Sequence, residues 1–385
     1  MTQTLPAGVA AEAAVYEDLG LRPVINARGN QTVLGGALLA PPVLEAMAAA
    51  NRYFVDMDAL LEQSGRQVAA LLECEAAYVT PGCAAALTLG TAACMTGDDG
   101  SKMERLPDSS GMRREVVIQA RHRYKYDRAV TVPGAVLREA GDASGTTPEQ
   151  LAAAIGPQTA AVLVPAHEDG REGTVPLNQV IELAHQQGVP VLLDAAAQVY
   201  PLERMRGWTK LGADLVCFGA KYFGAPHSTG LLCGRRDLVE SASQQGFIGF
   251  ERGRHRPIGR PFKVDRGEIV AVVVALRAWM TMDHEARIAR VQERVDAVVR
   301  RLEGIAGVTA TAVPRASFGA PALRVQLQPS AAGGQGVEGV ARALAEGNPS
   351  IQAHHDADSL HFNLTTVVDG DEQVIAERLR TVLAG

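Results

Sequence analysis

LVCFGAKYFGAPHSTG, at residues 215–230, places a single lysine where an apolar stretch of the chain ends. The run at 215–218 predicts a buried strand, and small residues surround Lys221 directly after it. A lysine in apolar surroundings has a lowered pKa and can act as a nucleophilic amine. Taken alone, the segment still favours a lysine whose amine reaches solvent, so the ends of the other strands must decide between the two interpretations.

Short apolar segments alternate with helical segments through most of the chain. Strands are expected at 75–80, 114–120, 134–140, 159–166, 189–196 and 213–220, with helices between several of them. Continuously apolar strands separated by helices are typical of a mostly parallel sheet that is covered on both faces. The sequence therefore predicts an α/β fold.

The pattern changes after about residue 260. One long helix is expected over 266–302, followed by three strands and two helices that are typical of a small α+β domain. We therefore expect three parts. They are an N-terminal arm and loop (1–45, with a helical arm over 1–20), a large α/β domain (46–262) and a small C-terminal α+β domain (263–385).

Composition and charge exclude several classes of protein. The net charge of the 385-residue chain is -6, so no overall basic field attracts nucleic acid or an anionic membrane. The five cysteines form no CxxC pair, which favours reduced thiols in a cytoplasmic protein. The sequence contains no predicted signal peptide, transmembrane span or metal-ligand spacing. These observations argue against nucleic acid, a membrane or a bound metal as the partner of the chain.

Four strand ends carry residues suited to chemistry, and ligands of open α/β sheets bind at such ends. TPGCAAA at 80–86 forms a small-residue turn into a helix, where backbone amides can bind phosphate. His122, Asp194 and Lys221 follow three later strands. Each has an ordinary structural explanation by itself: a connecting turn, a surface histidine, a capping or ion-paired aspartate, and a solvated lysine. Together they fit pyridoxal 5′-phosphate, which needs a phosphate cradle, a ring-stacking side chain, an acid at the pyridine nitrogen and an amine.

The same segments resemble a known family of enzymes. The chain is similar, over nearly its whole length, to fold-type I pyridoxal-phosphate enzymes of the class V aminotransferase superfamily. Within that superfamily it most resembles the branch that contains selenocysteine synthase and D-glucosaminate-6-phosphate ammonia-lyase. The resemblance rests on five segments: PVINARG (23–29), AAYVTPGCAAAL (76–87), LLDAAAQ (192–198), GAKYFGAPHSTGLL (219–232) and IGRPFKV (258–264).

The resemblance implies a role for individual residues. Lys221 would form the Schiff base with the cofactor, Asp194 would pair with the pyridine nitrogen, and His122 would stack on the ring. Gln198 would hydrogen-bond the cofactor's 3-oxygen. The cofactor phosphate would be held by the backbone amides of Gly82, Cys83 and Ala84, and the substrate would be met by Arg28, Arg260 and His227. The resemblance also implies a homo-oligomer, a dimer or a multiple of dimers.

The C-terminal segment HFNLTTV (361–367) stands where lyase-type relatives often have a proline-containing segment, and two single positions also differ from the pattern of these relatives. Phe218 stands where they commonly carry Ser or Thr, and His227 stands where they often carry Gln. Both changes fall next to the expected lysine, and they concern phosphate binding and substrate choice.

The expected function is a lyase that acts on a small amino acid or amino-sugar acid through an external aldimine and a Cα carbanion. Lys221 would remove the α-proton, and β-elimination with release of ammonia is the first choice. Racemisation, transamination and aldol cleavage begin in the same way and remain alternatives, and a non-catalytic cofactor-binding regulator is a further one. His122 and His227 are candidates for a second acid or base, whereas His354 and His355 are expected at the surface.

Overall fold

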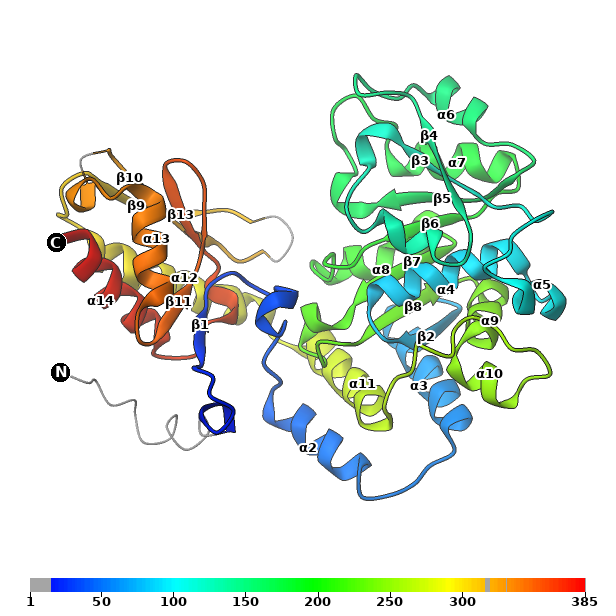
Figure 1. The fold of residues 1–385 in the computed structure, drawn as a ribbon, viewed down its shortest axis with the longest axis horizontal. Helices are drawn as coiled ribbons and strands as arrows, with labels where there is room; N and C mark the ends of the chain where they lie inside the picture. The colour runs from blue at the N-terminus through cyan, green and yellow to red at the C-terminus, as the bar shows by residue number, and fades with distance from the viewer. Residues whose placement is uncertain (1–14, 316–318, 330, 385) are drawn as a thin grey trace. The chain divides into compact units, whose positions relative to one another are not determined.

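The computed structural model describes residues 15–315, 319–329 and 331–384, so most of the arm expected over 1–20 lies outside the described residues. The chain forms two compact units, shown in Figure 1. The larger unit comprises residues 37–282, and the smaller comprises residues 1–36 together with 283–385. The N-terminal segment thus belongs with the C-terminal part of the chain, and the boundary lies at 282/283 rather than at the expected 262/263.

The larger unit is built on a seven-stranded sheet with the order β2-β8-β7-β6-β5-β3-β4. The strand β8 is antiparallel to both of its neighbours, and the other neighbouring pairs are parallel, which confirms the expected α/β fold with a mostly parallel sheet. The strands are β2 (Ala76–Thr80), β3 (Glu115–Gln119), β4 (Val136–Ala140), β5 (Thr159–Pro165), β6 (Val191–Asp194), β7 (Leu215–Gly219) and β8 (Gly230–Gly234).

The central strands of this sheet are covered on both faces. Every residue of β5, β6, β7 and β8 is buried. The helices of this unit are α2 (Pro41–Ala50), α3 (Met57–Leu72), α4 (Cys83–Thr96), α5 (Gly100–Arg105), α6 (Pro148–Ala154), α7 (Leu177–Gln186), α8 (Leu202–Leu211), α9 (Arg236–Gln245), α10 (Phe247–Arg252) and α11 (Arg266–Thr281).

The helix α4 packs closely on the sheet because of one glycine. A Cβ atom on Gly90 would lie 3.3 Å from the Cδ1 atoms of Leu192, Leu215 and Leu232, which belong to three adjacent strands. A side chain at this position would require the leucine side chains to shift by a few tenths of an ångström. The thiol of Cys83, the first residue of α4, donates to Asp194 at the end of β6 (3.4 Å), which places the N-terminal end of this helix at the carboxyl end of β6.

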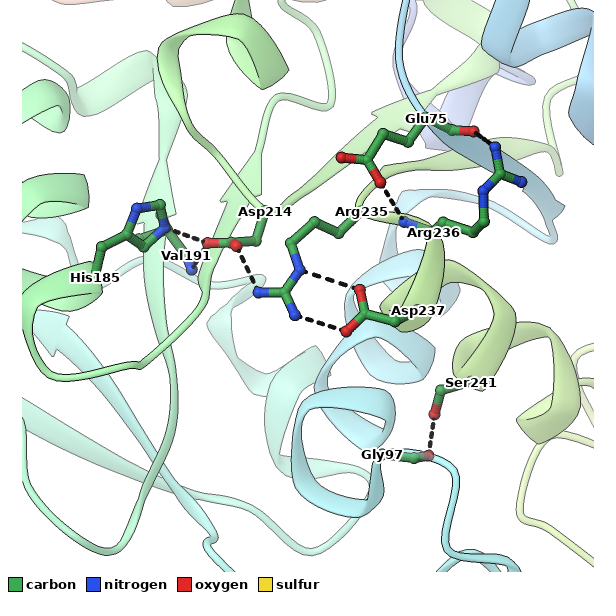
Figure 2. A network of polar contacts seen from close by, with 9 residues as sticks. All are labelled: Glu75, Gly97, His185, Val191, Asp214, Arg235, Arg236, Asp237 and Ser241. Atoms are coloured by element: carbon green, nitrogen blue, oxygen red, sulfur yellow. Dashed lines mark hydrogen bonds and ion pairs between the residues drawn. The ribbon is translucent and has the colours of Figure 1, made fainter.

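A polar network lies at the amino ends of the central strands (Figure 2). Asp214, which precedes β7, is 5% exposed and accepts hydrogen bonds from the Val191 amide (2.8 Å) and from Arg235 Nη1 (2.9 Å). Its Oδ2 also lies 2.8 Å from His185 Nε2. Arg235 in turn makes two hydrogen bonds to Asp237, of 3.1 and 2.6 Å. The network ties helix α9 to the amino ends of the central parallel strands.

The prediction of one long helix over 266–302 is wrong, because two helices occupy this range. The first is α11, and the second is α12 (His284–Leu302). Met282 between them is extended, and the Asp283 side chain accepts a hydrogen bond from the Ala286 amide at 2.9 Å. An aspartate in this position caps a new helix rather than continuing the previous one.

The smaller unit has a four-stranded antiparallel sheet with the order β12-β13-β10-β9. The short strand β1 (Val24–Asn26) pairs in parallel with β11 (Ser350–Gln352), which attaches the N-terminal segment to this unit. The remaining elements are β9 (Val308–Val313), β10 (Ala322–Leu327), α13 (Gly336–Glu346), β12 (His354–His355), β13 (Ser359–Phe362) and α14 (Asp371–Ala384). Helix α12 packs on α14 and on the strand β9. Among the described residues, no helix is both long and apolar enough to span a membrane.

Candidate active site

Lys221 lies in the short 3-10 turn Ala220–Phe223 that directly follows β7. Gly224 ends the turn with a φ of 84°, a conformation that a residue with a side chain rarely adopts. The lysine is half-buried, and burial lowers the pKa of its amine below the ordinary value. The turn therefore presents at the sheet edge an amine that is easier to deprotonate than a surface lysine.

Asp194 ends β6, the neighbouring strand, and is 5% exposed. The sheet pairs it with Cys217, four residues before Lys221. Within the described part of the chain, its carboxylate accepts hydrogen bonds from the Ala196 amide (3.1 Å), the Cys83 thiol (3.4 Å) and the Tyr124 hydroxyl. None of these donors is a cation.

The thiol and the phenol beside Asp194 stay protonated. Burial raises the pKa of Cys83 and of Tyr124, and the negative charge of Asp194 raises both further. Two of the three hydrogen bonds fall on Oδ1 and one on Oδ2. Because a carboxylate has about four lone-pair positions, one position on Oδ2 remains for a further donor.

The backbone of the turn between β2 and α4 has a conformation that allows an anion to come close to it. Gly82 precedes the helix with a φ of 89°, and the first turn of α4 contains no acidic residue. A Cβ atom on Gly230 would lie 2.4 Å from the Gly82 carbonyl carbon and 2.7 Å from the Cys83 nitrogen, so only glycine fits there. The Gly82 amide donates to the Thr80 carbonyl at 2.9 Å, so the phosphate-binding amides of this helix start would be those of Cys83 and Ala84.

His122 follows β3 in a 3-10 turn and is 1% exposed. Its Nε2 is buried and has no hydrogen-bond partner among the described residues. Burial lowers the pKa of the imidazole, so the ring is neutral at pH 7. Gln119, which lies 3.5 Å from His122 Nδ1, is itself fixed by two hydrogen bonds to Val175 (2.9 and 2.7 Å).

Two further predicted residues lie close in sequence to the lysine and the aspartate. His227 follows the Lys221 turn, its Nδ1 is buried without a described partner, and burial and the charge of Lys221 lower its pKa. Gln198 is 7% exposed, and its backbone amide donates to the Ala195 carbonyl at 2.9 Å in the turn after Asp194.

These groups fit pyridoxal 5′-phosphate. The uncharged donors around Asp194 leave its negative charge without a cationic partner, which suits the protonated pyridine nitrogen. The turn at Gly82 suits the phosphate, and the unpartnered ring nitrogen of His122 belongs to a side chain placed at the same sheet edge.

The other predicted residues have different surroundings. Phe218 is 1% exposed in the core of the sheet, so it supplies no polar group. Arg260 Nε lies 2.7 Å from Glu251 Oε1 in a half-exposed ion pair. In the smaller unit, His355 is exposed as expected, whereas His354 is half-buried. Arg28 also belongs to the smaller unit.

The sequence reasoning missed Tyr124 and His167. The rings of these two residues meet edge to face with centroids 5.6 Å apart, and Tyr124 carries the hydroxyl that binds Asp194. His167 follows β5 and could have been found by the same strand-end rule that identified His122. Tyr124 gave no comparable signal, because it lies in a loop and the orientation of its side chain depends on the folded chain.

Comparison with known proteins identifies relatives over nearly the full length of the chain. A family model described as aminotransferase class-V matches residues 125–317. The 5′-C-glycyluridine monooxygenase-decarboxylase of a Streptomyces species is 33% identical over 96% of this chain and 92% of its own length. The D-glucosaminate-6-phosphate ammonia lyase of Salmonella typhimurium is 31% identical over 96% of this chain and 97% of its own.

The solved structures agree with these relatives. The structure of D-glucosaminate-6-phosphate ammonia-lyase matches with a TM-score of 0.85 at 30% identity and covers 96% of this chain and 98% of that one. A ureidoglycine-glyoxylate aminotransferase from Bacillus subtilis matches with a TM-score of 0.58 at 13% identity over 94% and 93% of the two chains, which shows the fold alone. The resemblance inferred from the sequence is thereby confirmed. The chain belongs to the aminotransferase class-V family and is a pyridoxal-phosphate-dependent enzyme of fold type I.

Proposed function

We propose that this enzyme is an ammonia-lyase that acts on a 2-amino-3-hydroxy acid, such as a small amino acid or an amino-sugar acid. The α-proton and the β-hydroxyl leave as water, and hydrolysis of the resulting imine takes up one water and releases the amine as ammonia. The products are ammonia and a 2-keto acid that carries two hydrogens at the former hydroxyl carbon. The ammonia-lyase relative, 31% identical over nearly the whole chain, supports this choice among the alternatives.

The observation that carries the proposal is the pairing of a half-buried lysine with an aspartate that has only neutral donors. When bound, the cofactor would supply an electron sink next to the substrate Cα. Lys221 is the group suited to take the α-proton, because burial lowers the pKa of its amine. Asp194 would keep the pyridine nitrogen protonated, and Cys83 and Tyr124 would hold its carboxylate in place.

His227 is the second group that we assign to proton transfer. Its lowered pKa makes the imidazole neutral at pH 7, so it can take a proton from the ammonium form of Lys221. It can then return that proton to the departing hydroxyl. Gln198 and His122 would orient the cofactor, and the amides of Cys83 and Ala84 would hold its phosphate, because the Gly82 amide already donates to the Thr80 carbonyl.

A substrate screen tests the proposal. The purified holoenzyme is mixed with 2-amino-3-hydroxy acids and amino-sugar acids, and ammonia and 2-keto acid are assayed alongside the spectrum of the bound cofactor. We expect equal amounts of ammonia and keto acid with at least one substrate, and at least about a hundredfold less of both with Lys221→Ala. The proposal fails if a substrate changes the cofactor spectrum and is consumed while no ammonia forms.

The monooxygenase-decarboxylase relative, at 33% identity, favours oxidative decarboxylation as a second candidate. The same screen distinguishes the two reactions when it is run in an oxygen electrode with a carbon dioxide assay. Consumption of oxygen with release of carbon dioxide would replace the lyase assignment. If the substrate is consumed without uptake of oxygen and without release of carbon dioxide, the second candidate is excluded.

We further propose that the enzyme works in the cytoplasm as a homodimer or a multiple of dimers, without nucleic acid or membrane partners. The exposed side chains of Tyr53 (76%) and Phe54 (96%) in the larger unit support self-association, because large aromatic side chains rarely remain in contact with solvent. Sedimentation equilibrium of the holoenzyme tests this directly. A monomer at micromolar concentration would contradict it.

A further inference from the structure

Two of the five cysteines lie together where helix α3 meets the edge of the large sheet. Glu73 follows the last residue of α3 in the left-handed conformation, with a φ of 56°. The amide of Cys74 donates to the Ala69 carbonyl at 3.1 Å, which ties the next segment to the last turn of the helix. The chain thus turns at Glu73, and Cys74 lies in the bend before strand β2 rather than in the strand.

The side chain of Cys74 lies beside the pairing of β2 with β8. Its Sγ donates to the Ala76 carbonyl at 3.3 Å, and Ala76 pairs with Gly234. The next pair along the two strands joins Ala77 and Cys233. The Gly234 amide also hydrogen-bonds the Cys74 sulfur, and the two thiols hydrogen-bond each other. The sulfur atoms of the two cysteines are therefore neighbours.

The two cysteines differ in their access to solvent. Cys74 is half-buried and lines a cavity of about 820 Å³ between α3, β2, α9 and α10, through which a small oxidant can reach its sulfur. Cys233 is 1% exposed. Because Ala77 and Cys233 are directly opposite each other, their side chains lie on the same face of the sheet, and Ala77 lines the cavity as well. The Cys233 thiol can thus meet the Cys74 sulfur but not the solvent.

The surroundings also make one thiol more acidic than the others. Hydrogen bonds, above all the one with Cys233, lower the pKa of Cys74. The same hydrogen bond, together with burial, raises the pKa of Cys233. Burial raises the pKa of the remaining three cysteines, Cys83, Cys94 and Cys217. Cys74 is therefore the cysteine whose thiolate forms most readily, and the thiolate is the form that reacts.

We propose that Cys74 and Cys233 form an oxidative modification site, at which hydrogen peroxide converts the two thiols into an intramolecular disulfide. The Cys74 thiolate attacks one oxygen of the peroxide and the O–O bond breaks, which gives a sulfenic acid, while the other oxygen takes a proton and leaves as water. The Cys233 sulfur then bonds to the Cys74 sulfur, its proton goes to the departing hydroxyl, and a second water leaves. In total, two thiols and one peroxide give one disulfide and two waters.

The site lies away from the edge of the sheet that carries Lys221. Strand β8 begins at Gly230, which pairs with Gly219 directly before the Lys221 turn. Cys233 lies near the other end of the same strand. Oxidation of the pair should therefore leave the spectrum of the bound cofactor unchanged. Small thiols would reduce the disulfide again by thiol–disulfide exchange, so the modification is reversible.

Peroxide treatment of the holoenzyme, followed by peptide mapping without reductant, tests the site. We expect one equivalent of hydrogen peroxide to remove two of the five thiols of each chain and to join the peptides that contain Cys74 and Cys233. Dithiothreitol should restore both thiols, and the absorbance of the cofactor should stay constant throughout. None of these measurements uses a substrate, so the result does not depend on the lyase assay.

Three variants separate the two steps. In Cys233→Ala, Cys74 should accumulate as a sulfenic acid that dimedone traps, and no disulfide should form. In Cys74→Ala, the rate of thiol loss should fall by about tenfold or more, because the most acidic thiol is gone. Cys94→Ala is the matched control, because burial raises the pKa of this cysteine to about 12. It should form the same disulfide at the rate of the wild type.

Several results would overturn the proposal. They are a wild-type protein that keeps all its thiols, a disulfide that links other cysteines or two chains, and equal rates of thiol loss in Cys74→Ala and Cys94→Ala. A change in the cofactor spectrum in step with the loss of thiols would also overturn it. Such a change would assign the reaction to Cys83 or Cys217, because Cys83 donates to Asp194 and Cys217 pairs with it in the sheet.

Discussion

Asp194 and Asp214 are two aspartates of equal burial at opposite edges of the same sheet. Each is 5% exposed, Asp194 at the end of β6 and Asp214 directly before the adjacent strand β7. The Asp214 carboxylate is bound by Arg235, by His185 and by the Val191 amide (Figure 2). Asp194 is bound by a phenol, a thiol and one amide, all of them uncharged.

The difference separates a structural aspartate from the aspartate that we propose as functional. A buried carboxylate that already has a cation has little to offer a ligand, and removing it leaves its partners unsatisfied. A buried carboxylate held only by neutral donors keeps its charge for a ligand that arrives as a cation. Burial alone therefore does not identify a site, whereas the charge of the partners does.

The largest effect that this comparison predicts is at Lys221, which shares the edge of Asp194. Lys221→Ala should lower the turnover rate by about 10²–10⁴-fold, because the group that we propose moves the α-proton is lost. Borohydride treatment followed by mass spectrometry should detect no covalent cofactor on the variant. Lys210→Ala, which removes a surface lysine bound to Glu73, is the control and should retain the adduct. A reducible adduct on Lys221→Ala would show that another amine holds the cofactor.

Exchanging each aspartate for asparagine should give opposite results at the two edges. Asp194→Asn should weaken cofactor binding by about ten- to a hundredfold, as expected for the loss of a hydrogen bond to a charged group. The unfolding free energy of the cofactor-free chain should change little, because the Tyr124 hydroxyl and Cys83 thiol can rotate and accept from the new amide. Cofactor titration and urea denaturation measure the two quantities.

Asp214→Asn should instead lower the unfolding free energy by about 1–3 kcal/mol, because the Val191 amide and the Arg235 guanidinium cannot accept a hydrogen bond. Cofactor affinity should stay within about twofold of the wild type. Equal losses of stability in both variants would remove the distinction between the two edges.

The sequence predicts one side of this comparison better than the other. Asp194 and Lys221 were found because parallel strands place their carboxyl ends at one edge, so position in the pattern was enough. Tyr124 was not found, because its hydroxyl reaches Asp194 through a loop, 70 residues away in sequence. Gln31 and His354 are 323 residues apart, and no local pattern predicts that they meet.

The fold was predictable to a similar extent. The continuously apolar strands fixed the α/β class, since strands that are buried on both faces have few other sequence patterns. The break between α11 and α12 was missed because apolar residues continue through 282, and only Asp283 as a helix cap marks the end.

Tyr124→Phe gives a smaller effect that tests whether the phenol holds Asp194 in place. The variant removes one neutral donor, so kcat should fall by about two- to tenfold while KM for the amino substrate stays nearly constant. Tyr126→Phe is the control, because Tyr126 is 54% exposed and its ring contacts that of Tyr124 edge to face. A fall in kcat of equal size in both variants would indicate a packing effect of the loop rather than a role for the hydroxyl.

The smallest effect concerns pH and the buried His122 at the same edge. Burial lowers the pKa of His122 in the folded chain below the ordinary value of 6.5, so the unfolded chain binds a proton that the folded chain does not. The unfolding free energy should therefore fall as pH drops below about 6.5, with a contribution from this residue of at most about 1.4 kcal/mol per pH unit. The pKa values of His227 and His354 are also lowered, so these residues contribute to the pH dependence as well. The contribution of His122 is therefore measured as the difference between wild type and His122→Gln. Both are denatured with urea in the cofactor-free state from pH 7.5 to 5.5. The variant should lose less stability on acidification than the wild type. If the two pH profiles are parallel, His122 is protonated in the folded chain as readily as in the unfolded one, and its assignment as a neutral ring that stacks on the cofactor loses its electrostatic basis.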